Sequence, residues 1–279
     1  AIVRRSAGLD AQAQTLAANV DTVFVLVAAD GRVTPRSIER YVTLVWESGA
    51  TPVVVLTKAD LVSADDLDDA IEWLQPVCSP LGRQVKPPSV GVDLLVTSVP
   101  TGAGLADVAR YFGKGRTVAL LGSSGAGKST LANHLTGAAL ATGAVRDADH
   151  RGRHTTTHRE LVPLPGGGVL IDSPGLREVG LWHADDGVAR TFPEITALLD
   201  QCRFTDCSHR KEPGCAVTAA LADGKITEER LASWRKLRRE LDRLAARDDP
   251  ALRQQLRTEQ RRQFREYAQV RKQWRRQGR

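Results

Sequence analysis

The sequence predicts an α/β fold with a mixed, mostly parallel sheet, followed by a smaller helical C-terminal domain. Continuous apolar runs rich in β-branched residues alternate with helical patterns, which is typical of strands buried on both faces of a parallel sheet. One of these runs leads through a glycine-rich loop directly into a helical stretch, as in phosphate-binding α/β proteins. After about Gly187 the strand signals stop and the chain becomes helical.

The apolar runs are the expected strands, and the helices lie between them. Strands are expected at residues 23–29, 52–57, 92–97, 117–121 and 169–171, and helices at residues 37–46, 65–74 and 105–112. Residues 160–164 are expected to pair antiparallel with 169–171, because a Pro-Gly-Gly-Gly turn joins them. We interpret the domains as a remnant or linker at 1–17, the sheet domain at 18–186 and the helical domain at 187–279.

Composition indicates a folded protein with an anionic partner. The 279 residues are 42% hydrophobic and 26% charged, far from the composition of disordered chains. A formal net charge of +6 favours a polyanionic partner. No apolar run approaches the length of a membrane span and no signal peptide is visible, so we expect a cytoplasmic monomer with no membrane partner. The chain has no Met and begins with Ala1, which we interpret as a piece of a longer protein.

A phosphate-binding loop is the strongest motif. Residues 122–129 satisfy the pattern G-x-x-x-x-G-K-S/T between an expected strand and an expected helix. Glycines allow the backbone to wrap around phosphates, and the helix directs its positive dipole end at the same anion. We expect Lys128 to reach the β- and γ-phosphates and the Ser129 hydroxyl to bind Mg²⁺. The expected nucleotide contacts are Gly122, Ser123, Ser124, Gly125, Ala126, Gly127, Lys128, Ser129 and Thr130.

A second acidic motif follows the strand at residues 169–171. Its sequence is Asp-Ser-Pro-Gly, residues 172–175. We expect Asp172 to hold Mg²⁺ through water and the Gly175 N–H to sense the γ-phosphate. A D-x-P-G segment alone is more often an ordinary turn, so this interpretation depends on the phosphate-binding loop upstream.

Two loops closer to the N-terminus are candidates for base recognition. Asp60 could accept hydrogen bonds from the ring N–H and amino group of guanine, which adenine lacks, while Lys58 lies along the base and Ser98 steadies the loop. Thr57 replaces the Asn of the common N-K-x-D pattern, which leaves its bracing role open. Alone, T-K-x-D is more often a solvated strand end. The expected contacts are Thr57, Lys58, Ala59, Asp60, Ser98 and Val99.

Three of the four cysteines cluster with a histidine. Cys202, Cys207, His209 and Cys215 provide a Cys₃His set, which is enough to close a tetrahedral structural zinc site with no open catalytic position. The alternative is three buried cysteines and an unrelated histidine. Cys78 is expected to be buried as a small hydrophobic residue.

The order of these motifs resembles one family. In ordinary Ras-like GTPases the phosphate loop comes first, whereas here Asp60 and Ser98 precede Lys128 and Asp172. With the zinc spacing, this order resembles the ribosome small-subunit-dependent GTPase A family (RsgA, also called YjeQ) over residues 16–217. The resemblance implies a circularly permuted P-loop GTPase with a smaller zinc-containing helical C-terminal domain. Members usually carry an N-terminal OB-fold, of which only the trailing edge would be present here.

The resemblance also implies the activity and the first switch. It implies hydrolysis of GTP to GDP and phosphate late in maturation of the small ribosomal subunit, stimulated by docking on the subunit and its rRNA. Residues 153–157 correspond to the first switch, where Thr156 would cap Mg²⁺ and the γ-phosphate, although a threonine run alone favours a strand. Leu176 stands where many GTPases place a water-orienting glutamine, so slow intrinsic turnover is expected, with help on docking or from His154 or His158.

The C-terminal tail is a candidate RNA contact. Residues 260–279 hold eight Lys or Arg against one acid and are interleaved with aromatic residues, which suits phosphate contact with base stacking. The candidate contacts are Arg261, Arg262, Arg265, Arg271, Lys272, Arg275 and Arg276. The alternative is a solvated helix that packs its aromatic residues on the sheet domain. Residues 230–257 mix both charges and are interpreted as scaffold.

Two other functions stay open at this point. One is a nucleotide-gated RNA-binding module with negligible hydrolysis, which Leu176 makes plausible. The other is an ATPase of another P-loop class, against which Asp60 argues.

Overall fold

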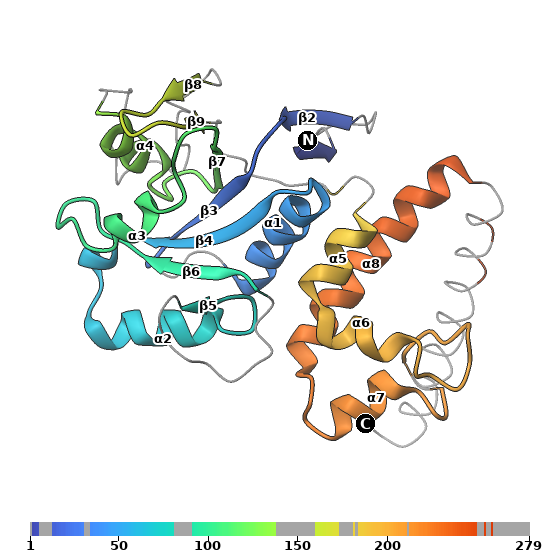
Figure 1. Ribbon diagram of the computed structural model, residues 1–279. Coiled ribbons are helices and arrows are strands. Elements are labelled where there is room, and N and C mark those ends of the chain that lie inside the picture. Colours follow the sequence, from blue (N-terminus) through green and yellow to red (C-terminus); the bar gives the residue numbers. More distant parts are fainter. Residues whose placement is uncertain are drawn as a thin grey trace, which may run out of the picture.

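The computed structural model describes residues 2–5, 13–30, 34–80, 91–137, 160–172, 181, 184–210 and 212–249, with residues 254 and 258. A seven-stranded sheet has the order β5-β6-β4-β3-β7-β9-β8 (Figure 1). Its strands are β3 (Thr22–Ala28), β4 (Thr51–Thr57), β5 (Ser79–Pro80), β6 (Asp93–Val96), β7 (Thr117–Gly122), β8 (Glu160–Pro163) and β9 (Val169–Asp172). All neighbours pair parallel except β8 and β9, which pair antiparallel. The mixed, mostly parallel sheet is confirmed.

Helices cover both faces of this sheet because side chains alternate along its central strand. Val23, Val25 and Val27 of β3 join one apolar cluster with α1 (Pro35–Glu47) and α2 (Ala64–Leu74). Phe24 and Leu26 join the other cluster, with α3 (Leu105–Ala109) and α4 (Lys128–Thr136). The predicted helix at 105–112 is shorter in the structure, since hydrogen bonds three residues apart replace the α-helical pattern from residue 110 onward.

The described part of residues 1–17 is a strand pair packed on the core. Strands β1 (Ile2–Arg5) and β2 (Ala13–Ala17) are antiparallel. Ile2 and Leu16 are buried in the same cluster as α1. This segment was interpreted from sequence as a remnant or linker, and the packing could not be read from its short apolar pattern.

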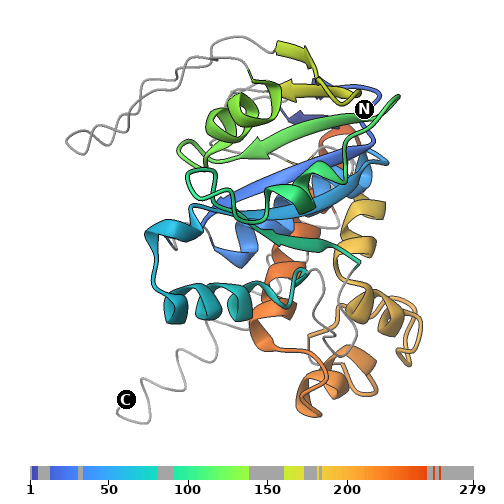
Figure 2. The same cartoon turned by 60° about the vertical axis from the view of Figure 1, so that its left-hand side comes forward.

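The described residues beyond β9 form helices and turns without a strand, as predicted. Its helices are α5 (Asp185–Thr191), α6 (Pro193–Leu199), α7 (Ala216–Ala222) and α8 (Glu228–Asp248). Helices α5 and α8 lie beside α1, on the side away from the sheet, and α7 lies farther from α1 (Figures 1 and 2). Among the described residues, none of the helices combines the length and the apolar character that crossing a bilayer requires.

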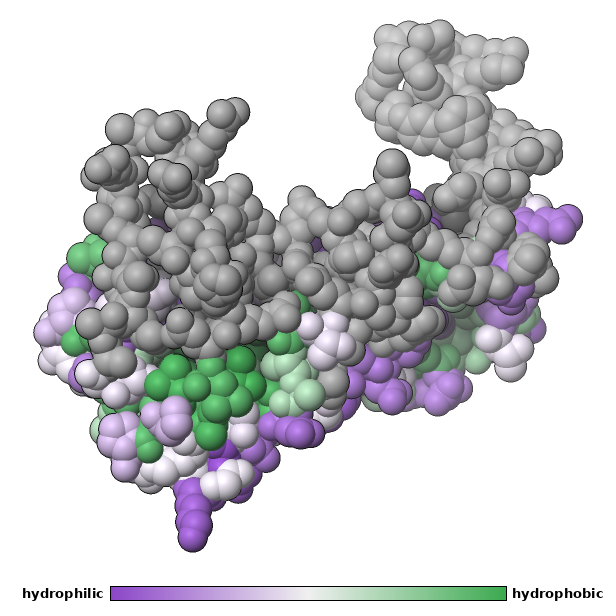
Figure 3. Space-filling model, turned by 90° about the horizontal axis from the view of Figure 1, so that it is seen from above, coloured by the Kyte–Doolittle hydropathy of each residue, from purple (hydrophilic) through white to green (hydrophobic). Residues whose placement is uncertain are grey.

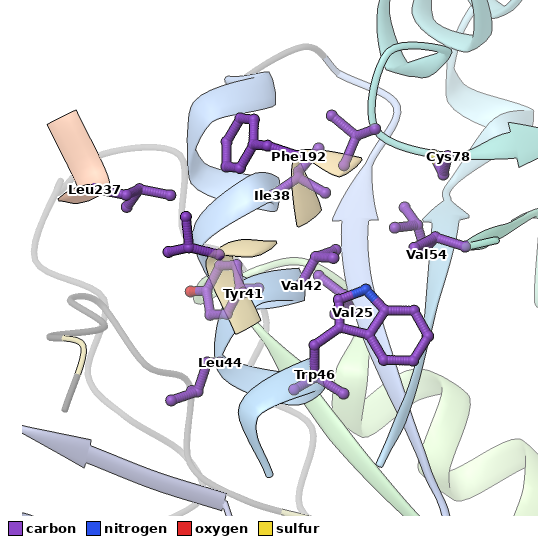
Figure 4. Packing of buried hydrophobic residues seen from close by; sticks show 14 of the residues in the cluster. Val25, Ile38, Tyr41, Val42, Leu44, Trp46, Val54, Cys78, Phe192 and Leu237 are labelled. Atoms are coloured by element: carbon purple, nitrogen blue, oxygen red, sulfur yellow. The ribbon is translucent and has the colours of Figure 1, made fainter. Parts of the chain in front are cut away.

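Helix α1 is packed between the sheet and the C-terminal helices. In the close view, Val25 and Val54 lie on one side of α1 and Leu237 lies on the other (Figure 4). Helix α5 approaches so closely that a Cβ added at Gly187 would lie 2.2 Å from the Thr43 carbonyl oxygen. No side chain fits there, so glycine is required at this crossing.

A buried ion cluster fixes this packing. Arg230 of α8 is 6% exposed, and its guanidinium lies 2.7 Å from a carboxylate oxygen of Glu39 on α1 and 2.7 Å from one of Glu194 on α6. The same guanidinium lies 4.2 Å from the ring centroid of Phe192, and Ser233 donates a hydrogen bond to Glu39. Because each buried charge has a partner, the cluster is tolerated in the core and joins the helical domain to α1.

Candidate functional site

The candidate nucleotide loops gather at one edge of the sheet. Strands β4, β6 and β7 are parallel, so Thr57, Thr97 and Gly122 at or just after their ends lie at the same edge. Strand β3 lies between β4 and β7. Open α/β sheets bind ligands at this edge, outside the carboxyl ends of the strands.

The phosphate-binding loop has the geometry that its sequence predicts. Gly127 is left-handed, with φ +86°, and begins α4, as a glycine readily does. Lys128 is 8% exposed, and its Nζ donates hydrogen bonds to the carbonyl oxygens of Gly122 at 3.0 Å and Ser123 at 2.7 Å. The ammonium group therefore lies against its own loop at the positive end of a helix, which is suited to an anionic ligand.

Thr57 links the candidate base loop to the phosphate loop. Its hydroxyl is a hydrogen-bond donor to the Ala126 carbonyl oxygen at 2.9 Å and lies 3.2 Å from the Val27 carbonyl oxygen. A Cβ added at Gly127 would lie 3.4 Å from the same hydroxyl oxygen. The sequence left open whether Thr57 braces this loop. In the structure its hydroxyl does so, because it contacts both the end of β3 and the phosphate loop.

The two candidate base loops also contact each other. The Ala59 N–H donates to the Thr97 carbonyl oxygen at 3.2 Å, and Lys58 adopts a left-handed φ of 60°. Such a backbone is uncommon for a bulky residue and tends to occur at functional sites. Ser98 is buried, and its hydroxyl accepts a hydrogen bond from the Thr101 N–H at 3.3 Å. Asp60 lies exposed in the short 3₁₀ helix Ala59–Leu61.

Several candidates from the sequence lie outside the described residues. Asp172 is described and is the last residue of β9, which lies beside β7, the strand that leads into the phosphate loop. Its contact with Mg²⁺ stays a prediction. The others remain predictions: Thr156, His154, Gly175, Leu176 and the tail residues Arg261, Arg262, Arg265, Arg271, Lys272, Arg275 and Arg276.

The four candidate zinc ligands come together. The Sγ atoms of Cys202, Cys207 and Cys215 and a ring nitrogen of His209 all lie within 4.8 Å of one another. The Cys202 Sγ is 3.4 Å from His209 Nδ1 and 4.0 Å from the Cys215 Sγ. Thiolates about 2.3 Å from a shared tetrahedral zinc ion would lie on the order of 4 Å apart, so the set fits such an ion.

Neighbouring groups that the sequence did not single out support this cluster. Glu212 accepts hydrogen bonds from the N–H groups of Ser208 at 3.1 Å and Arg210 at 3.0 Å, which shapes the loop around His209. On α8, the Trp234 ring contacts His209 edge-on with centroids 5.8 Å apart, and Arg235 donates to the His209 carbonyl oxygen. The cluster is therefore attached to α8.

The thiols differ in acidity. Burial raises the pKa of Cys215, but hydrogen bonds from Thr218, His209 and Cys207 outweigh it and lower that pKa to about 6. The pKa of Cys207 is raised to about 11, mainly by burial. A backbone hydrogen bond from His209 lowers this pKa, while the Cys215 and Cys202 thiols raise it further. Cys215 thus ionises before Cys207, and a cation is needed to hold both as thiolates.

The chain order of these loops defines the class. The candidate base loops precede the phosphate loop in sequence yet lie with it at one sheet edge, so the protein is a circularly permuted P-loop GTPase. The RsgA GTPase family model matches residues 1–182. The chain belongs to the RsgA GTPase family, which confirms the resemblance indicated by motif order.

Relatives and solved structures agree with this assignment. The "Small ribosomal subunit biogenesis GTPase RsgA" of Streptomyces coelicolor is 49% identical over 94% of this chain and 69% of that protein. The crystal structure of YjeQ from Thermotoga maritima matches with a TM-score of 0.58 and 28% identity, over 80% of this chain and 72% of that one. YloQ, described as a circularly permuted GTPase, matches with a TM-score of 0.57 and 26% identity, over 82% and 69%.

Proposed function

We propose that this chain binds GTP, hydrolyses it to GDP and phosphate, and acts late in maturation of the small ribosomal subunit, where docking on the subunit and its rRNA accelerates hydrolysis. The observation that carries the proposal is the meeting of the Thr57, Ser98 and Lys128 loops at one sheet edge. The name of the Streptomyces coelicolor relative supports the ribosomal role. Such a protein would work in the cytoplasm, and we propose that it does so as a monomer.

Catalysis in this proposal is positioning and charge stabilisation. Asp60 accepts hydrogen bonds from the guanine edge, and Thr57 keeps that loop in register with the phosphate loop. Lys128 moves its ammonium group from the loop carbonyls to the β- and γ-phosphates. Ser129, Thr156 and Asp172 offer hydroxyl and carboxylate oxygens, which fit Mg²⁺, and this ion supplies positive charge at the phosphates when bound. Gly175 would sense the γ-phosphate, and His154 is a candidate for aiding the attacking water.

Phosphate release measured with and without purified small ribosomal subunits tests this function. Because Leu176 cannot orient water, we expect slow turnover alone and a rise of about tenfold or more with saturating subunits. Negligible release in both conditions, together with nucleotide-dependent RNA binding, would favour the nucleotide-gated RNA-binding module instead. Equal rates in both conditions would contradict stimulation by docking.

Metal content tests the Cys₃His cluster. We expect one zinc ion per chain, held by Cys202, Cys207, His209 and Cys215. Removal by a chelator should lower the melting temperature, because metal-binding free energy is folding free energy in such sites. A Cys78→Ser variant is the control and should keep its zinc, since Cys78 is buried elsewhere in the core. Purified protein without zinc would contradict the site.

A further inference from the structure

The two faces of helix α8 differ in how their charges are paired. On the buried side, Arg230 is held by Glu39 and Glu194, and at the edge of the helix the partly exposed Arg238 lies 2.5 Å from a carboxylate oxygen of Asp185. The acids of the helix also turn toward partners: Glu240 lies 2.5 Å from Arg40, and Asp242 lies 3.6 Å from Arg238. Glu240 and Asp242 of α8 are therefore already paired with cations other than those described next.

The outer side of α8 carries three exposed cations, Lys236, Arg239 and Arg243, which we call the α8 cationic stripe. Their spacing of three and four residues places them on one face over about 10 Å of helix. In the described part of the chain, no carboxylate oxygen lies within 4.0 Å of a charged nitrogen of these three residues. The Nε of Arg239 donates to the Arg235 carbonyl oxygen at 3.1 Å.

Aligned cations of this kind weaken a helix unless an anion is present. Like charges three or four residues apart repel, by a few tenths of a kcal/mol per pair. The acids at helical spacing from the stripe are Glu240, four residues after Lys236, and Asp242, three residues after Arg239. They are paired with Arg40 and Arg238. When these cations neutralise the phosphates of a nucleic acid, the counterions condensed on that polyanion are released, and this release favours binding.

We propose that the α8 cationic stripe binds the phosphodiester backbone of RNA. The inference rests on the proposed function, which supplies small-subunit rRNA as the polyanion. The buried face of α8, with Trp234 and Leu237, packs inward, so the stripe can dock without disturbing the core. In the space-filling view from above, hydrophilic and hydrophobic residues alternate over the visible part of the molecule, at the helical end as at the sheet end (Figure 3). The contact is independent of base sequence, because it involves phosphates alone.

The test is the salt dependence of binding by the full zinc-loaded chain. Its probes are purified small ribosomal subunits and protein-free small-subunit rRNA transcribed in vitro. The triple variant Lys236→Gln, Arg239→Gln, Arg243→Gln should reduce the slope of log affinity against log salt by about 2 to 3 for both probes. Its melting temperature should stay near that of the unaltered chain, because the three side chains are exposed.

A matched variant separates local contact from net charge. Arg110→Gln, Lys114→Gln, Arg116→Gln removes the same charge from exposed positions just after α3 and should keep the original slope. An equal change of the salt slope in both variants would overturn the inference, and so would an unchanged slope in the α8 variant. In either case, hydrolysis that small subunits still stimulate would leave the proposed function intact. If the α8 variant changes the salt slope with subunits but not with protein-free rRNA, the stripe contacts a ribosomal protein, which would also overturn the inference. Failure of the unaltered chain to bind or respond to subunits would instead remove the proposed function.

Discussion

Replacing Lys128 by Ala is expected to lower the rate of GTP hydrolysis by about 100- to 1000-fold, the loss seen when one preorganised charge stabiliser is removed. The Lys128 ammonium group is buried and held 3.0 and 2.7 Å from two carbonyl oxygens of its own loop. It therefore lies within the phosphate loop before the nucleotide arrives, and it exchanges these carbonyl oxygens for the β- and γ-phosphates when the nucleotide binds. Single-turnover phosphate release with saturating small subunits measures the effect.

Lys114→Ala is the control for the Lys128 variant. Lys114 is an exposed lysine in the loop after α3, so its removal changes net charge by the same amount and should leave the rate unchanged. A Lys128→Ala rate within about threefold of the unaltered chain would contradict the role assigned to the phosphate loop. Melting temperatures of both variants, measured alongside, separate a loss of rate from a loss of fold.

Replacing Arg230 by Ala is expected to lower the free energy of unfolding by about 3–5 kcal/mol. The change leaves Glu39, itself 3% exposed, as a buried carboxylate without its cation, and removes the partner of Glu194 and the contact with Phe192. Denaturant unfolding followed by circular dichroism measures the loss. The same variant should loosen the helical domain from α1.

Arg238→Ala is the matched comparison for the Arg230 variant. Its ion pair with Asp185 is 41% and 64% exposed, so its removal should cost less than about 1 kcal/mol. A double variant with Glu39→Ala should destabilise less than the sum of the two single changes, because the residues are in direct contact. An Arg230→Ala loss no larger than that of Arg238→Ala would contradict the buried cluster.

Local patterns predicted the strands β3, β4, β6, β7, β8 and β9 and the phosphate loop, because their signals lie within a few residues, but not the short strands β1, β2 and β5. The apolar run at residues 117–121, the glycines and Lys128 together predict a strand, a loop and a helix start, and the structure contains all three. The clustering of the four candidate zinc ligands was predicted for the same reason, since the first and the last are thirteen positions apart.

Contacts between distant segments could not be predicted in this way. The Thr57 hydroxyl meets Ala126 across the end of β3, at a separation of 69 residues, so its bracing role needed the sheet order. Arg230 and Glu39 are 191 residues apart, and the mixed charges of α8 indicated only scaffold. Which cations of α8 face inward depends on where α1 and α5 pack against it.

We expect the permuted loops to assemble one guanine-specific site, and competition between GTP, xanthosine triphosphate and ATP for the chain measures that specificity. The unaltered chain should prefer GTP over both competitors by about 100-fold or more, because Asp60 pairs with two guanine donors. Asp60→Asn, which supplies an amide donor, should lose GTP affinity by a similar factor and favour the xanthine nucleotide, whose carbonyl matches it. If Asp60→Asn leaves the GTP preference unchanged, Asp60 does not recognise guanine. If the unaltered chain binds ATP as tightly as GTP, the permuted loops do not form a guanine-specific site.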